Sequence, residues 1–219
     1  MAGAAGGGRF RGARTLLPAR GPAARAAALA RQRVAPPVKR VEAEAQALSP
    51  AQAAVQGFGA VSDARARVLV LGTMPGVVSL AAGRYYANPR NAFWPIMAAL
   101  YGIDPQADYG IRLAQLRDAG VALWDVLAEC ERPGSLDAAI VAGSARANDF
   151  AAFLAAHPAI ERIAFNGAKA AALFKRHALP QLAGLERPLC YLSLPSTSPA
   201  HAAQPLAAKL AAWRALAQA

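Results

Sequence analysis

Residues Val68–Met97 read VLVLGTMPGVVSLAAGRYYANPRNAFWPIM, an apolar run followed by a glycine-rich turn and a polar, aromatic loop. The run Val68–Leu71 is rich in β-branched residues and too short for a core helix, which favours a buried strand. The turn Gly72–Gly76 holds two glycines and a proline, which disfavour regular structure and present backbone N–H groups where the strand ends. Because open α/β sheets bind ligands at the carboxyl ends of their strands, this turn is a candidate binding wall.

The second half of this stretch is rich in aromatic rings and amides. Two adjacent tyrosines, Tyr85 and Tyr86, precede the segment Asn88–Trp94, NPRNAFW. Amides, a guanidinium and aromatic faces together suit a planar polar ligand such as a nucleobase beside a phosphate. The alternative is structural: a strand, a turn and an amphipathic helix whose aromatic side chains belong to the core. The pattern by itself is compatible with both interpretations.

Apolar runs and helical spacing along the rest of the chain predict an α/β fold. The expected strands are Val68–Leu71, Val121–Trp124, Ile160–Phe165 and Pro188–Leu194. The expected helices are Ala92–Tyr101, Ile111–Asp118, Asn148–Ala156, Ala168–Arg176 and Pro205–Ala217. Because strands alternate with helices, we predict a three-layer α/β/α sandwich around a mostly parallel four-stranded sheet.

Charge and composition divide the chain into three parts. Residues 1–40 carry nine basic and no acidic side chains, which account for most of the net charge of +11. We expect a disordered basic tail at 1–48, a linker at 49–67 and a folded domain at 68–219. Three explanations compete for the tail: an arm that adds DNA affinity through phosphate contacts, a start site assigned too far upstream, and a transit peptide.

Composition excludes several classes of protein and cofactor. The two cysteines, Cys130 and Cys190, lack CxxC spacing, which argues against a disulfide scaffold, a zinc site and an iron–sulfur cluster. No G-x-G-x-x-G or phosphate-loop motif occurs, and the three histidines lack metal-ligand spacing. No stretch of about 18 uninterrupted apolar residues predicts a transmembrane helix. We therefore expect a cytoplasmic protein without metal, cofactor or membrane contact.

Polar residues follow every predicted strand, and parallel strands bring their carboxyl ends to one edge of the sheet. These ends are Gly72–Gly76, Asp125, Asn166–Lys169 and Pro195–His201. An amide such as Asn166 offers the donor and the acceptor needed to bond a base edge, and a tyrosine such as Tyr86 can stack on the base. The structural alternatives are a turn residue for Asn166 and a core ring for Tyr86.

Side chains beside these ends suit a nucleic-acid backbone. Arg90 and Lys169 are candidates for phosphate neutralisation, with solvated loop and helix charges as the alternative. A proline-stiffened loop that can bond phosphates or enter a duplex supplies further candidates, Pro195, Ser196, Thr197, Ser198 and His201. Nucleophilic hydrolysis by one of these serines with the histidine is disfavoured, because no G-x-S-x-G surrounds either serine.

Four ordered motifs resemble the uracil-DNA glycosylase superfamily: LGTMPG from Leu71, YYANPRNAFW from Tyr85, IAFNGAKA from Ile163 and LPSTSPAHA from Leu194. Within it they are most similar to the hypoxanthine-DNA (deoxyinosine) glycosylase branch. The resemblance covers residues 68 to about 217. It implies an α/β/α enzyme that flips a deaminated base, with hypoxanthine as the expected base, out of DNA. The enzyme would hydrolyse the N-glycosidic bond without metal or cofactor.

The resemblance also implies roles for individual residues. In mismatch-uracil relatives the first motif is G-x-N-P-G, and its asparagine positions the attacking water. This chain has Met74 there, so the resemblance shifts the catalytic role to Asn91 of the second motif. Tyr86 is expected to stack on the flipped base and Asn166 to face it. The pocket wall is expected to consist of turn residues, namely Gly72, Thr73 and Met74.

Several points stay open. Asn91 also fits a structural role as a helix N-cap. Asn88 stands where the family usually has histidine, so catalytic strength or base preference can differ. The expected partner is double- or single-stranded DNA with a deaminated base, bound by a monomer at the nucleoid of a bacterial cytoplasm. Two alternatives are a uracil or mispaired-thymine glycosylase and a noncatalytic nucleic-acid-binding module with the same fold.

Overall fold

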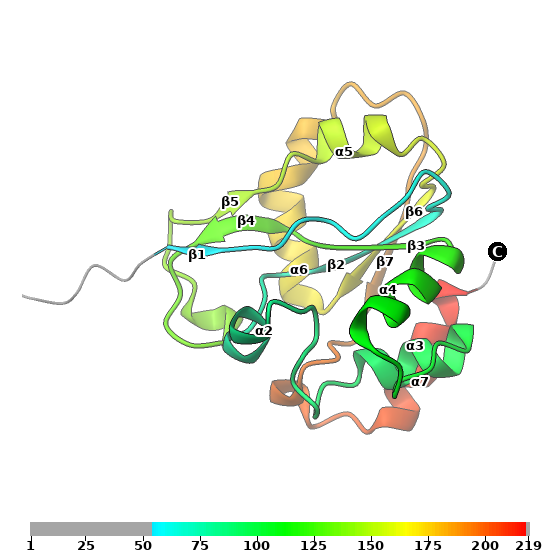
Figure 1. Ribbon diagram of the computed structural model, residues 1–219. Coiled ribbons are helices and arrows are strands. Elements are labelled where there is room, and N and C mark those ends of the chain that lie inside the picture. Colours follow the sequence, from blue (N-terminus) through cyan, green and yellow to red (C-terminus); the bar gives the residue numbers. More distant parts are fainter. Residues whose placement is uncertain (1–53, 218–219) are drawn as a thin grey trace, which may run out of the picture. The chain divides into compact units, whose positions relative to one another are not determined.

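The computed structural model describes residues 54–217 (Figure 1). Its centre is a parallel sheet with the strand order β3-β2-β6-β7. The strands are β2 (Val68–Gly72), β3 (Val121–Asp125), β6 (Arg162–Asn166) and β7 (Cys190–Leu194). The predicted four-stranded parallel sheet is therefore confirmed. The predicted basic tail, 1–48, lies outside the described residues.

Helices cover both faces of this sheet, which confirms the three-layer sandwich (Figure 1). On one face lie α3 (Phe93–Tyr101), α4 (Tyr109–Asp118) and α7 (Leu206–Trp213). On the other face lie α5 (Phe150–Ala156) and α6 (Ala168–Leu173). We call the two hydrophobic layers the α3-side cluster and the α6-side cluster; their largest side chains include Phe93 and Trp213 in the first, and Phe150 and Phe174 in the second.

A second, antiparallel sheet is absent from the sequence prediction. Its strands, in the order β1-β4-β5, are β1 (Val55–Gln56), β4 (Leu127–Cys130) and β5 (Arg146–Ala147). Two of them are only two residues long, too short to show an alternating pattern. The range 49–67, expected to be a linker, supplies β1 and also Val61, which bridges to Leu123. From residue 54 onward this range is thus part of the folded body.

Two further elements depart from the prediction. A six-residue helix, α2 (Val77–Ala82), follows the glycine turn and ends at Gly83, whose φ of 61° lies in the left-handed region. The expected helix Ala168–Arg176 is α6 followed by the π-helical turn Phe174–Ala178. Among residues 54–217, no helix has the length and apolar character to cross a membrane.

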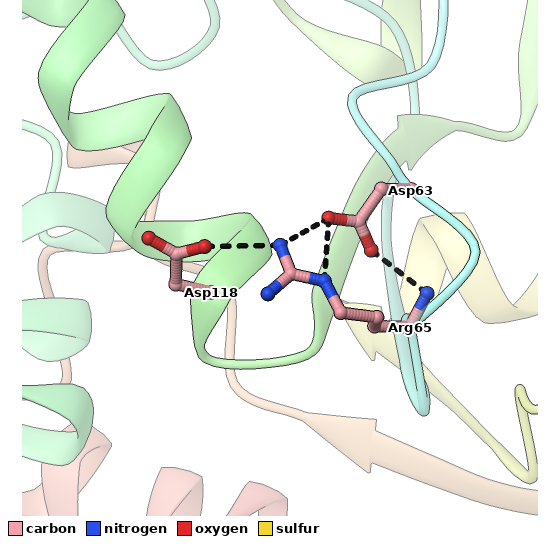
Figure 2. A network of polar contacts seen from close by, with 3 residues as sticks. All are labelled: Asp63, Arg65 and Asp118. Carbon is pink, nitrogen blue, oxygen red and sulfur yellow. Dashed lines mark hydrogen bonds and ion pairs between the residues drawn. The ribbon is translucent and has the colours of Figure 1, made fainter.

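Polar contacts at the amino end of the sheet fasten the segment before β2 to the end of α4. Arg65 pairs with Asp63 at 2.6 Å and with Asp118 at 3.0 Å (Figure 2). The hydrogen bonds from Arg65 lower the pKa of Asp63. Because the Arg65 and Asp118 side chains are both exposed, this network contributes little stability. It lies at the end of the strands opposite to the candidate site, so Asp118 can serve as a remote control position.

Candidate active site

The last residues of three neighbouring strands lie on the same face of the sheet. Side chains alternate along a strand, and Val70, Leu123 and Ala164 all belong to the α3-side cluster. Two residues later on the same strands stand Gly72, Asp125 and Asn166. These three residues therefore face the α3 side of the sheet, at its carboxyl edge, as parallel strands predict.

Tyr86 lies over this edge. Its ring stacks on Phe93 with 4.0 Å between centroids, and its hydroxyl accepts a hydrogen bond from Asn166 Nδ2 at 3.0 Å. Its φ of 53° makes it the one non-glycine residue with positive φ in the described part of the chain, a strained backbone of the kind that gathers at functional sites. Burial, and next the negative charge of Asp125, raise the pKa of Tyr86, so the phenol stays neutral.

Asn166 and Thr197 form a tight clamp. Asn166 Nδ2 donates to Thr197 Oγ1 at 2.8 Å, and Asn166 Oδ1 accepts from Thr197 N at 2.8 Å. The Thr197 carbonyl in turn accepts from Ala92 N, just before α3. Both amide hydrogens of Asn166 are thus engaged within the protein. Thr197 was predicted to contact DNA, but it is only 1% exposed. Its hydroxyl therefore holds the loop in place instead of facing solvent.

The remainder of the Pro195–His201 loop lies at the surface. Pro195, Ser196 and Ser198 are partly exposed and His201 is exposed. The loop approaches the start of α6 closely, because a Cβ on Gly167 would lie 3.0 Å from Ser196 Cβ. Gly167 also has a φ of 105°, which side-chain-bearing residues rarely adopt. The predicted phosphate-binding side chains Arg90 and Lys169 are exposed, on different segments beside this edge.

Asn91 borders a hollow of about 410 Å³ next to Tyr86. Its Oδ1 accepts from Phe93 N, the first residue of α3, at 3.0 Å. The N-cap of α3 is Ala92, however, so Asn91 is not the N-cap that the structural alternative predicted. Its Nδ2 makes no hydrogen bond to another described residue and remains free to hold a water or a substrate atom. Arg84 and Arg112 line the same hollow, and the Arg112 guanidinium lies 4.6 Å over the Trp94 ring. Asn88, which replaces the histidine of the family pattern, also lines it.

A buried arginine shapes the glycine turn. Arg132 is 4% exposed and donates to the carbonyls of Met74 and Pro75. Thr73 is buried, and the nearby Asp137 carboxyl has its pKa raised by burial, which the Thr73 hydroxyl partly opposes. The Met74 side chain, expected in the pocket wall, belongs to the α6-side cluster on the opposite face of the sheet. Only the Met74 backbone therefore remains near the site, since its thioether packs in the core.

Asp125 is the polar strand end to which the sequence assigned no role. It pairs in register with Gly72, and its carboxyl lies where a Gly72 side chain would be: an added Cβ would lie 2.3 Å from Asp125 Oδ1 and 3.3 Å from the Tyr86 hydroxyl. Burial first, and then the charge of Asp137, raise the pKa of Asp125 from 3.8 to about 7, although Arg132 opposes the shift. For Asp125, the available sequence signal was a carboxyl at the end of an apolar strand. For Arg132, it was a basic residue directly before the turn Pro133-Gly134.

Gly72→Ala tests this packing. We expect the free energy of unfolding to fall by about 1–3 kcal/mol, because the methyl group overlaps the buried Asp125 carboxyl. Urea unfolding of Gly72→Ala, Asp125→Ala and the double variant measures the coupling between the two positions. The methyl should cost much less once the carboxyl is removed. If Gly72→Ala lowers the free energy of unfolding equally in the wild type and in Asp125→Ala, the added methyl group does not overlap the Asp125 carboxyl.

Within residues 54–217, no group of three or more His, Cys, Asp or Glu side chains is arranged to hold a metal ion. The site instead combines a stacking ring, amides, backbone N–H groups and one buried carboxyl. Such a set can orient a planar base and a water molecule, and it can stabilise charge through fixed dipoles.

Comparisons with known proteins agree with this architecture. The family described as "Uracil DNA glycosylase superfamily" matches residues 58–217. A hypoxanthine DNA glycosylase from Methanosarcina barkeri is 35% identical over 115 residues, covering 52% of this chain and 72% of the relative. One from Methanosarcina acetivorans is 36% identical over 116 residues, with the same coverage.

A solved structure supports the fold as well. It is a solution NMR structure from Methanosarcina acetivorans, of a protein proposed to be a uracil DNA glycosylase. It is 30% identical, has a TM-score of 0.61, and the match covers 75% of this chain and 99% of that one. The family match spans most of the chain, and the resemblance seen in its four motifs is confirmed. The chain therefore belongs to the uracil DNA glycosylase superfamily and is a DNA glycosylase.

Proposed function

We propose that this DNA glycosylase removes hypoxanthine from DNA and leaves an abasic site. One observation carries the choice of base and of catalytic residue: the first-motif position holds Met74, whose side chain packs in the α6-side cluster, whereas Asn91 lines the hollow beside Tyr86. A thioether in the core cannot position water. The names of the two Methanosarcina relatives, both hypoxanthine DNA glycosylases, support the same base.

In the proposed reaction the extruded base stacks on Tyr86, whose other face already rests on Phe93. Asn91 Nδ2 orients a water toward C1′ of the sugar. An amide is not a useful base near neutral pH, so its contribution is positioning. As the C1′–N bond breaks, positive charge develops on the sugar and negative charge on the base. Backbone N–H groups of the Gly72–Gly76 turn stabilise the latter.

Asn166 takes part by exchanging partners. Its two amide hydrogens bond Tyr86 and Thr197 in the free protein. Giving up the Tyr86 bond frees one donor for the carbonyl oxygen of the base, while the Thr197 bonds keep the amide oriented. Arg90, Lys169 and the exposed part of the Pro195–His201 loop supply phosphate contacts on either single- or double-stranded DNA. The chain acts as a monomer in this proposal.

A panel of duplexes that each contain one hypoxanthine, uracil, xanthine or mispaired thymine tests the proposed base. We expect the full-length protein to release hypoxanthine fastest, with an alkali-labile abasic site as product. Undamaged duplex of the same sequence is the control. Preferential release of uracil or thymine would favour the alternative glycosylase. Salt-sensitive binding without any abasic product would contradict glycosylase activity itself.

A further inference from the structure

Asp125 is a buried carboxyl without a partner. It is 4% exposed, and its Oδ2 is shielded from solvent and makes no hydrogen bond within the described residues. Among residues 54–217, the one side-chain hydrogen bond to Asp125 goes to its main chain, where Asn148 Nδ2 donates to the Asp125 carbonyl at 2.8 Å. Burial of an unpaired carboxylate is costly, so such groups concentrate where a ligand or a reaction uses them.

Nearby charges leave this carboxyl unneutralised. Arg132 is the cation that lowers the pKa of Asp125. Its guanidinium is already engaged, because it donates to the carbonyls of Gly134, Met74 and Pro75 and pairs with Asp137 at 3.5 Å. The Tyr86 hydroxyl lies near Asp125 Oδ1 above Gly72, whereas the Tyr85 hydroxyl bonds the carbonyls of Phe58 and Gly59. Burial first, and then the charge of Asp125, raise the pKa of both tyrosines. Asp137 adds further negative charge. The surroundings therefore favour the neutral carboxylic acid.

The acid is placed where the base would leave. Asp125 Oδ1 and the Tyr86 hydroxyl both approach the same point above Gly72, and Asn166 holds that hydroxyl from the next strand. We expect a base that stacks on Tyr86 and bonds Asn166 to lie next to the Asp125 carboxyl. Hypoxanthine carries acceptor nitrogens in its rings, which a carboxylic acid can protonate. Uracil has two ring nitrogens: N1, which is bonded to the sugar, and N3, which carries a hydrogen. Uracil therefore has no ring nitrogen that can accept a proton in this way.

Resting on the proposed hypoxanthine glycosylase function, we propose that Asp125 is a further catalytic residue, the general acid that protonates a ring nitrogen of the departing purine. The C1′–N9 bond breaks with its electron pair moving to the base, while the acid proton of Asp125 goes to a ring nitrogen. The base leaves as neutral hypoxanthine and Asp125 becomes a carboxylate. The water held by Asn91 adds its oxygen to C1′, and its released proton returns to solvent, from which Asp125 is protonated again.

The protonation state of Asp125 suits this step. Desolvation, and then Asp137, raise the pKa of Asp125 to about 7, so the acid form persists near neutral pH. General acids work best when their pKa lies near the working pH, and they typically contribute about 10²–10⁴ in rate. Activity on hypoxanthine must then fall as the pH rises through this pKa, because the carboxylate has no proton to give.

Single-turnover release of hypoxanthine by the full-length protein, at saturating enzyme from about pH 5.5 to about pH 9, tests the proposal. We expect a plateau at low pH and a decline of about tenfold per pH unit above the Asp125 pKa. Asp125→Asn should be slower by about a hundredfold or more on the plateau and should lose the decline. Asp118→Asn, an exposed carboxylate at the opposite end of the sheet, should match the wild type.

The outcomes separate this inference from the function on which it rests. Asp125→Asn with a rate within about threefold of the wild type and the same pH profile overturns the role of Asp125 alone. A wild-type rate that is constant or rises across the range also overturns it, even where the variant fails to fold. A wild-type protein that releases no deaminated base from any duplex overturns the proposed function, and the general acid with it.

Discussion

Asn91→Ala should reduce single-turnover release of hypoxanthine by at least about a thousandfold, close to 4 kcal/mol in barrier height. The side chain lines the hollow beside Tyr86, and its Nδ2 is free to hold the attacking water. Without it the water loses its orientation toward C1′, and positioning of this kind is worth several kcal/mol. The measurement is alkali cleavage of a duplex with a single deoxyinosine, and binding to the same duplex is expected to change little.

A matched variant separates catalysis from structure at this position. Asn91 Oδ1 also accepts from Phe93 N, so alanine removes a hydrogen bond to the first residue of α3, worth about 0.5–1.5 kcal/mol. Asn91→Ser keeps an acceptor that can make that bond but lacks the amide donor. It should therefore unfold at nearly the wild-type temperature and remain inactive. Activity of either variant within about tenfold of the wild type would end the assignment of Asn91.

Protein stability should depend on pH through Asp125. Its pKa is raised from 3.8 to about 7, chiefly by burial, so the folded protein holds a proton that the unfolded chain has released. A raised pKa contributes stability that is fully present below the unfolded value and is lost as the pH climbs to the folded value. Relative to Asp125→Asn, the wild type should lose up to about 4 kcal/mol between pH 4 and pH 7, and little more above.

Urea unfolding of both proteins at a series of pH values measures this difference directly. Taking the difference between wild type and variant cancels the titration of every group they share. Asp118→Asn replaces an exposed carboxylate in the same way and provides the baseline. A wild-type minus Asp125→Asn difference that stays constant from pH 4 to pH 8 would show that the carboxyl is paired or solvated.

Predictions from sequence succeeded where each residue's neighbours along the chain determine the outcome. The four main strands are largely apolar runs closed by a polar residue, a glycine or a proline, and the structure has strands in all four places. The small sheet was missed because β1 and β5 are two residues long and exist only through pairing with β4. Their formation depends on a partner far away in sequence.

The same distinction holds for the candidate site. Residue type and position mark Asn91, Tyr86 and Asn166 as candidates, because amides and an aromatic ring beside strand ends suit a base. Whether each side chain is free to act depends instead on its neighbours in the folded chain. Asn166 is engaged by Thr197 and Tyr86, and the predicted DNA contact Thr197 is buried.

The amino-acid sequence alone thus specifies the α/β/α sandwich, the superfamily and the edge of the sheet that holds the candidate site, because apolar periodicity and strand-end motifs are local properties. Only the tertiary structure places the Met74 thioether in the α6-side core and the Asp125 carboxyl against Gly72. Strand register and side-chain direction determine which groups meet, and burial determines their protonation. A carboxyl that the sequence marks only as the end of a strand is thereby buried beside Gly72 and the Tyr86 hydroxyl, with its pKa raised to about 7.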